Sequence, residues 1–296
     1  MGATGVLQGM SGASMALMLG IYHEFIFSLG TLDRTAFRLL LKKQFSNCWK
    51  RINGNFLLVV LAGISAGLTG LRALFSFYLE QYPIYISSFF FSLVIIAALL
   101  LLRKVTRWNA GVVISFAVAL AVSYFVTRSP PFTSPDQILF SFLAGILTGA
   151  TFIIPGVSGA FILMFIGKYQ YILTSFGSLE FDVIILFIAG GILGFLVIAR
   201  FMSRLLADFH NATVALFAGL MIGSLNKIWP WREVFEYATT IQGKRIPAFD
   251  KSILPWRYLE LTGKDPQVFY AILMMALGVF MVVLIEKIAA RLKTKS

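Results

Sequence analysis

The chain has 296 residues, of which 58% are hydrophobic and only 13% are charged, and its mean hydropathy is +0.85. These values exclude an ordinary soluble domain and predict an integral membrane protein. The formal charge of +12 comes from cations in short segments between apolar runs, which argues against nucleic acid as a partner.

Few residues could bind a metal or form a cross-link. Cys48 is the single cysteine, and His23 and His210 are the only histidines. An intramolecular disulfide and a Cys/His metal centre are therefore excluded, and we expect neither a metal nor a cofactor. The first residues lack a basic region followed by a cleavage site, so we expect no signal peptide.

Six apolar runs approach the length needed to cross about 30 Å of hydrocarbon as helices. None alternates with the period of a barrel strand, so we expect an all-α integral membrane protein. Two further apolar segments, residues 2–27 and 138–173, carry Gly and Ser at their centres. In chain order, the six predicted spans cover residues 56–75, 84–102, 110–126, 182–200, 212–228 and 268–286.

Lys and Arg orient these spans, because cytoplasmic loops carry an excess of positive residues. Basic clusters at residues 34–51, 103–107 and 287–295 should therefore be cytoplasmic, which includes the basic C-terminal tail. If successive spans cross the membrane in alternate directions, all three basic clusters lie in the cytoplasm only when segment 138–173 does not cross. This segment should therefore be re-entrant, entering from the outer face and returning to it. Segment 2–27 should likewise enter from the cytoplasm and return there. The polar residues 229–266 then form an outer loop, interpreted as a small interfacial cap.

The two interrupted segments are copies of one another. Residues 2–22, GATGVLQGMSGASMALMLGIY, align without a gap on residues 149–169, GATFIIPGVSGAFILMFIGKY, with nine of 21 positions identical. Three spans separate the copies, so the second should be inverted relative to the first. Inverted repeats with broken helices are a transporter architecture, with the site between the repeats.

This pattern predicts a single membrane domain over residues 1–296, built from inverted-topology repeats. Each repeat should hold a re-entrant helical hairpin plus transmembrane helices. The predicted boundaries are repeat one at about 1–103, a connecting span at 110–127, repeat two at about 138–228, the outer loop at 229–266 and a last span at 267–287.

The broken segments supply the candidate binding site. Non-helical backbone at membrane depth is tolerated only when it is buried in protein or lines a watery cavity. Glycines allow close approach to a ligand, and serine hydroxyls beside free N–H groups at a helix N-terminus favour an anion. The alternative is that these small residues serve close helix packing. The candidates are Gly9, Ser11, Gly12, Ser14, Pro155, Gly156, Ser158 and Gly159.

Charged residues near the broken segments are further candidates. Arginines near span ends could bind a phosphate on either side, or could simply extend to the interface. A lysine in the second hairpin could be a countercharge, with the same alternative. Carboxylates at the hairpin ends could carry a coupling proton or cap helices. The candidate arginines are Arg72, Arg200 and Arg204, the lysine is Lys168, and the carboxylates are Glu24, Glu180 and Asp182.

An enzyme is the alternative from another class. Residues 9–12 and 156–159 both fit the GxSG pattern around the serine of rhomboid intramembrane proteases. Such a serine needs a histidine base on a neighbouring span, and neither His23 nor His210 is well placed for that role. A nucleophile is also needed once rather than twice, so this alternative is the weaker one.

The motifs PGVSGAFILMFIGKY at 155–169 and QGMSGASMALMLGIY at 8–22 resemble the bacterial polyprenyl-phosphate transporter family. The stretch LFAGLMIGSL at 216–225 is similar to that family as well. The first copy departs from the family pattern, since Gln8 replaces a usual Pro, and Gly5 and Ala13 replace a common acidic residue and a common Gly.

The resemblance implies a non-enzymatic translocase in the bacterial cytoplasmic (inner) membrane. It would return undecaprenyl phosphate, the lipid carrier of cell-wall precursors, from the outer to the inner leaflet by alternating access. The nearest competing function is secondary transport of a small anion, which the same site would suit. Coupling to H+ or Na+ and assembly into a homo-oligomer are left open by the resemblance.

Overall fold

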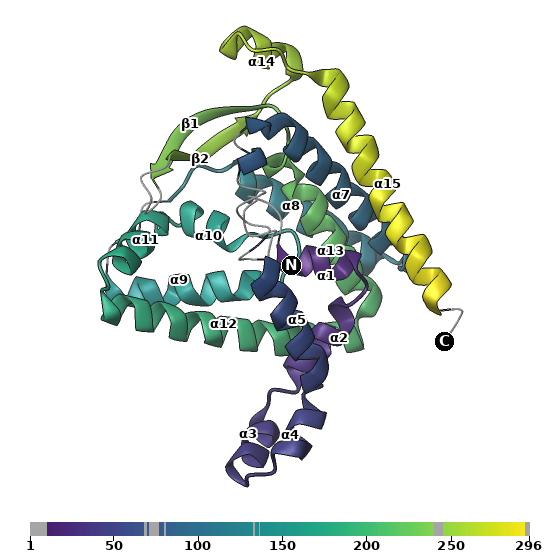
Figure 1. The fold of residues 1–296 in the computed structure, drawn as a ribbon, viewed down its shortest axis with the longest axis vertical. Coiled ribbons are helices and arrows are strands. Elements are labelled where there is room, and N and C mark those ends of the chain that lie inside the picture. The colour runs from purple at the N-terminus through teal and green to yellow at the C-terminus, as the bar shows by residue number, and fades with distance from the viewer. Residues whose placement is uncertain are drawn as a thin grey trace.

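The computed structural model describes residues 11–67, 70, 77–79, 81–132, 134–135, 137–239 and 245–293. Over these residues the chain is mostly helical (Figure 1). Three helices are long and apolar enough to cross a membrane, and shorter apolar helices accompany them, which confirms the expected helical membrane protein. The three long helices are α7 (Pro83–Arg103), α8 (Ala110–Arg128) and α12 (Phe181–Asp208).

Shorter elements complete the chain. The apolar ones are α5 (Gly54–Ala66), α9 (Ile138–Thr151) and most of α15 (Val268–Lys293), while α13 (His210–Ser224) continues into the 3-10 helix η3 (Leu225–Lys227). Within the predicted span 212–228, the α-helix therefore ends at Ser224, and a 3-10 helix follows. The other helices are α1 (Gly12–Met18), α2 (Tyr22–Gly30), α3 (Arg34–Leu41), α4 (Phe45–Arg51), α10 (Gly159–Phe165), α11 (Tyr169–Gly177) and α14 (Pro255–Thr262).

Glycines bring two pairs of helices into backbone contact. Between α9 and α12, a Cβ at Gly149 would lie 2.0 Å from the carbonyl oxygen of Gly191. Between α8 and α13, a Cβ at Gly219 would lie 2.4 Å from the carbonyl oxygen of Phe116. Small residues allow this approach, which favours helix association where lipid removes most of the hydrophobic driving force. At Gly149 and Gly219, glycine therefore serves close packing of helices.

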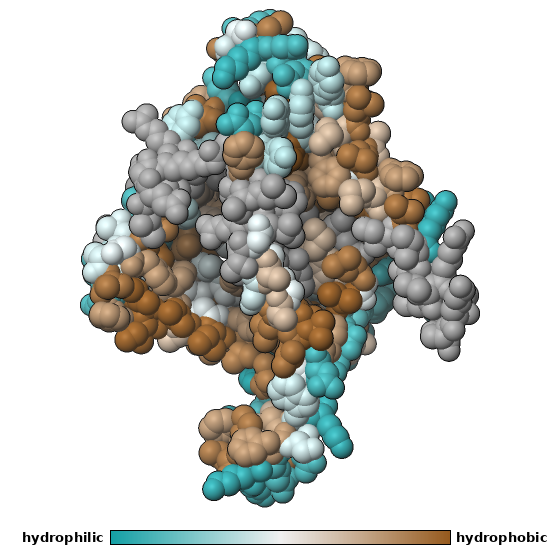
Figure 2. All heavy atoms as spheres, in the orientation of Figure 1, coloured by the Kyte–Doolittle hydropathy of each residue, from teal (hydrophilic) through white to brown (hydrophobic). Residues whose placement is uncertain are grey.

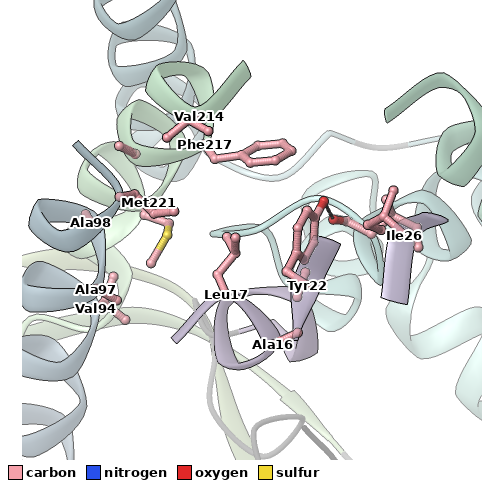
Figure 3. Packing of buried hydrophobic residues seen from close by; sticks show 14 of the residues in the cluster. Ala16, Leu17, Tyr22, Ile26, Val94, Ala97, Ala98, Val214, Phe217 and Met221 are labelled. Atoms are coloured by element: carbon pink, nitrogen blue, oxygen red, sulfur yellow. Dashed lines mark hydrogen bonds between the residues drawn. The ribbon is translucent and has the colours of Figure 1, made fainter. Parts of the chain in front are cut away.

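The first-copy helices α1 and α2 lie in the interior, against α7 and α13 (Figure 3). Tyr22 is 1% exposed, and its ring packs edge-on against the ring of Phe217, with centroids 5.4 Å apart. Ala16 is fully buried on α1 and lets that short helix approach its neighbours. The core thus holds the first repeat motif in a fixed place next to α13.

Polar surface lies at two opposite ends of the molecule (Figure 2). One end is the α3–α4 pair, where Asp33 begins α3 by accepting a hydrogen bond from the N–H of Ala36 at 2.9 Å. Asp33 also pairs with Arg51 at 2.7 Å. These two hydrogen bonds, that from Arg51 first, lower the pKa of the Asp33 carboxyl to about 2.

The other polar end overturns the all-α expectation. Within the predicted outer loop 229–266, β1 (Arg232–Thr239) pairs antiparallel with β2 (Arg245–Ser252), followed by α14. Trp229 and Trp231 fasten this hairpin, since their indole N–H groups donate to the carbonyls of Ile253 at 2.7 Å and Pro266 at 2.8 Å. Buried Trp commonly finds such a partner. The cap is therefore a folded unit, and it includes a small sheet.

Candidate functional site

The interrupted segment in repeat two is a loop between α9 and α10. Helix α9 ends at Thr151, and residues 152–158 are non-helical. Pro155 is fully buried, and Gly156 has a φ of +82°, which L side chains rarely adopt. A Cβ at Gly156 would also lie 2.9 Å from the backbone nitrogen of Met221 on α13. The glycine is thus needed both for the turn and for the close contact with α13.

Serines of repeat one contact this loop directly. Ser11 begins α1, and its Oγ accepts a hydrogen bond from the N–H of Ser14 at 3.2 Å. Ser11 Oγ donates to the carbonyl of Ile154 at 3.3 Å, and the N–H of Gly156 donates to Ser14 Oγ at 2.9 Å. The loop of repeat two and the start of α1 therefore meet through polar contacts, although more than 140 residues separate them.

The contacts form one directed chain of hydrogen bonds, which we call the serine relay. The two hydroxyl oxygens, Ser11 Oγ and Ser14 Oγ, lie 3.2 Å apart. Because the Ser11 hydroxyl donates to Ile154, the Ser14 hydroxyl is the donor between them. The relay runs from the Gly156 N–H through Ser14 and Ser11 to the carbonyl of Ile154. Ser11 and Ser14 are buried, at 6% and 1% exposure.

Tyr22 adds a second contact between the repeats. Its hydroxyl donates to the carbonyl of Ile153 at 2.7 Å, one residue before the end of the relay. In the sequence, Tyr22 is one of the positions that are identical in the two copies, where it aligns with Tyr169. Its true partner is a carbonyl of the other repeat, which a single sequence gives no signal to find.

Ser158 occupies the equivalent position to Ser11 in the second copy. It precedes α10 and is 6% exposed, yet its side chain makes no capping hydrogen bond. The following residue, Gly159, is tightly enclosed, since a Cβ there would lie 3.0 Å from both Thr148 Cγ2 and Thr151 Oγ1. Gly12 begins α1 in the same way as Gly159 begins α10.

The helix boundaries repeat at the same offset as the sequence. Shifting α1 and α2 by 147 residues reproduces the bounds of α10 and α11. Gly20 and Gly167 both have positive φ, +73° and +68°. In each copy the next residue, Ile21 or Lys168, donates its N–H five residues back, which is a Schellman cap. The repeated Gly therefore ends the first short helix of each copy.

The other predicted residues are distributed over the structure. Lys168 is fully buried, and its Nζ donates to the carbonyls of Ser134 and Pro135 and lies 5.1 Å from the Tyr171 ring centroid. Arg200 donates to the carbonyl of Leu32, just before α3. Arg204 is exposed on α12. Gly9 and Arg72 lie outside the described residues.

The predicted coupling carboxylates lie near helix ends. Glu24 accepts a hydrogen bond from Asn53 Nδ2 at 2.8 Å, and Glu180 accepts from the hydroxyls of Ser175 at 2.8 Å and Ser178 at 3.0 Å. Asp182 lies in the first turn of α12. The contacts of Glu24 and Glu180 join side chains and cap no helix, and the role of the three carboxylates in coupling stays a prediction.

The histidines pair with each other. The His23 and His210 rings stack with centroids 5.3 Å apart. In the part of the chain that the structure describes, no hydrogen bond connects either ring to Ser11 or Ser158. Over the same residues, no group of three His, Cys, Asp or Glu side chains could hold a metal ion.

Sequence reasoning missed one buried charged cluster. Lys227 Nζ lies 2.9 Å from Asp250 Oδ1, and Arg232 Nη1 lies 2.6 Å from Asp250 Oδ2. Lys227 lies at the end of the predicted span 212–228 and Asp250 lies in a polar loop, so neither residue was a candidate from the sequence. Only the pairing of the β hairpin with the end of α13 brings them together.

Comparison with known proteins gives consistent results. A family described as "Undecaprenyl phosphate translocase-like" matches residues 1–246. A "Polyprenyl-phosphate transporter" from Vibrio cholerae is 28% identical over 98% of this chain and 94% of its own length. A protein of the same description from Staphylococcus aureus is 27% identical over 59% of this chain and 68% of its own length. No solved structure matches.

Proposed function

We propose, because the chain belongs to the undecaprenyl phosphate translocase-like family, that it returns polyprenyl phosphate from the outer to the inner leaflet by alternating access. The family is one of membrane transporters and not of enzymes, so the intramembrane protease alternative is set aside. The leaflet direction, the moving parts and the residues that bind the head group are our proposal.

The serine relay is the observation that carries this proposal. It places hydroxyls and a backbone N–H from both repeat motifs together in the buried interior. A phosphate alone in hydrocarbon is prohibitively unfavourable, whereas a head group moving through a polar passage with its polyprenyl tail in lipid avoids most of that penalty. Ser11, Ser14, Ser158 and Gly156 would hold the head group at the crossing point, by turning their donors toward it.

An inverted repeat explains how access could alternate. The matching helix bounds and Schellman caps of the two copies support a structural repeat, and three predicted spans between them support its inversion. The α1–α2 and α10–α11 pairs would be the re-entrant hairpins. Rocking of one repeat against the other would break the relay and open the crossing point to one face at a time.

Charge supports an orientation with α3 and α4 in the cytoplasm. The α3–α4 end carries the basic cluster 34–51 and lies opposite the β hairpin in Figure 1. Helix α15 runs from the β-hairpin end of the molecule toward the α3–α4 end, so its C-terminus lies nearer to α3 and α4. Arg200 and Arg204 lie on α12 near Leu32, so they would receive the phosphate on the cytoplasmic side.

The test is a leaflet-resolved transport assay with undecaprenyl phosphate in liposomes. We expect the double variant Ser14→Ala/Ser158→Ala to slow translocation by about tenfold or more, because each lost charge-assisted hydrogen bond is worth about 1.5–3 kcal/mol. Ser129→Ala is the control, since that half-buried serine lies at the end of α8 and donates a hydrogen bond to the carbonyl of Phe125.

Two results would contradict the proposal. Normal translocation by the serine double variant would remove the relay from the transport path. Uptake of soluble phosphate into liposomes without movement of the lipid would instead support the small-anion transporter.

A further inference from the structure

A buried cluster of three charges joins the β hairpin to the end of α13. It consists of Lys227 on η3, Arg232 on β1 and Asp250 on β2. The side chains of Lys227 and Asp250 are each 3% exposed, and that of Arg232 is 21% exposed. Two cations therefore share a single carboxylate, which leaves one positive charge in excess.

Over the described residues, no second carboxylate balances the excess charge, since neither Lys227 nor Arg232 has an ion pair with one. Arg232 Nη1 and Asp250 Oδ2 form an ion pair at 2.6 Å, although the two groups are not aligned for a hydrogen bond. A buried cluster with one positive charge in excess is unfavourable, so an additional anion would stabilise it.

The cluster lies on the β-hairpin side of the serine relay. Lys227 Nζ is 5.2 Å from the ring centroid of Phe161, on the short helix α10 that begins after Ser158. Lys227 also lies six residues beyond Met221, whose backbone contacts the relay at Gly156, which is about 10 Å along a helix. In Figure 1, α10 lies between the β hairpin and α9.

We propose that Lys227 and Arg232 form a binding site for the phosphate monoester of a polyprenyl lipid, with Asp250 holding the two cations until the head group replaces it. This inference rests on the proposed function and adds a site before the relay, on the β-hairpin side. An arginine suits a phosphate because its planar group can donate two parallel hydrogen bonds, and a lysine adds a point charge. The partly exposed Arg232 gives the head group its first contact.

A purely structural role is the competing explanation. A buried ion pair can simply fasten two elements, and replacing both partners by neutral groups is then often harmless. The double variant Lys227→Met/Asp250→Asn separates the two roles, because it replaces both buried partners by neutral groups and leaves Arg232, which is 21% exposed, as the one charge of the cluster. A structural latch survives this change, whereas an anion site loses its lysine.

The experiment measures binding of farnesyl phosphate to the full-length protein in lipid nanodiscs by calorimetry, with farnesol and inorganic phosphate as comparison ligands. We expect the double variant to bind farnesyl phosphate about 10–100-fold more weakly than the wild type, the range for loss of a charged hydrogen bond. The control is Lys251→Met on the same hairpin, whose exposed side chain lies over Phe235. We expect that variant to bind like the wild type.

Failure of the proposed charged site and failure of the proposed transport function would give different results in this experiment. If the double variant folds and binds farnesyl phosphate within about twofold of the wild type, the cluster is a latch and the inference is wrong. Binding of inorganic phosphate as tight as that of farnesyl phosphate, and lost in the double variant, would overturn the lipid as the ligand. If wild-type protein does not distinguish farnesyl phosphate from farnesol and moves no undecaprenyl phosphate in liposomes, the proposed function itself fails.

Discussion

Gly156→Ala is the sharpest test of how the loop before α10 is held. Two separate penalties apply at this position. An alanine at a φ of +82° is strained by roughly 1–2 kcal/mol. Its methyl group would also lie 2.9 Å from the backbone nitrogen of Met221 and 3.0 Å from the carbonyl oxygen of Leu220. Backbone atoms cannot rotate away, so the clash adds about 1–3 kcal/mol.

Comparison with Gly263→Ala isolates the steric clash of Gly156→Ala from its backbone strain. Gly263 ends α14 with a φ of +65°, and a Cβ there would meet no atom within 4 Å. Both variants share the strain of positive φ and the reduced freedom of the unfolded chain, so these effects cancel in the comparison. The difference in unfolding free energy between the two variants should therefore be about 1–3 kcal/mol, with Gly156→Ala the less stable.

The measurement is reversible unfolding of both variants in mixed detergent micelles, followed by leaflet-resolved transport in liposomes. Gly156→Ala also shifts the N–H that donates to Ser14, so its transport should fall while that of Gly263→Ala stays normal. Equal unfolding free energies for the two variants would refute the close contact between the loop and α13.

Three further predictions concern other parts of the structure. Gly194→Ala would place a methyl group 2.1 Å from a carbonyl oxygen of α9 and should destabilise the protein by about 2 kcal/mol or more in the same unfolding assay, whereas Gly63→Ala, in open space on α5, should not. Tyr22→Phe keeps the ring contact but removes the hydroxyl bond to repeat two, so it should lower stability by about 1–2 kcal/mol. The lowered pKa of Asp33 means that its bond to Arg51 stabilises α3 above the usual carboxyl pKa near 4 and that this contribution is lost as pH falls toward 2. The protection of the α3 amides, meaning their exchange relative to the intrinsic rate at each pH, should accordingly fall from pH 6 to pH 3 in the wild type and should be low at both values in Asp33→Asn. Equal protection in both proteins at pH 6 would contradict the role of the ion pair.

Sequence patterns predicted the parts of this fold that follow from local chemistry. Long apolar runs gave α7, α8 and α12, because a helix is the form in which one segment satisfies all its backbone groups in lipid. Gly20 and Gly167 recur in the aligned copies, and the structure shows that each follows the end of a short helix, where the cap needs a residue that tolerates positive φ.

Contacts between distant residues could not be predicted in the same way. The outer loop 229–266 was interpreted as a small interfacial cap, and its strands were not predicted, because β1 pairs with another segment of the same polar loop. Asp250 and Lys227 are 23 residues apart and carry no motif. Ser14 was predicted only as a candidate binding residue, and the structure identifies its hydroxyl as the acceptor for the Gly156 N–H.

The direction of the serine relay bears on how a carrier avoids leaking ions when it is empty. Each hydroxyl in the relay donates once, and the chain ends on a carbonyl, so Ser11 and Ser14 need no water to satisfy their hydroxyl groups. A continuous file of water through a membrane protein would conduct protons and dissipate the potential across the membrane. Under the proposed function, an arriving anion would take the Ser11 hydroxyl away from Ile154, which would couple opening of the passage to the arrival of its cargo. The intact relay would then help to keep the bilayer sealed while the protein is unloaded.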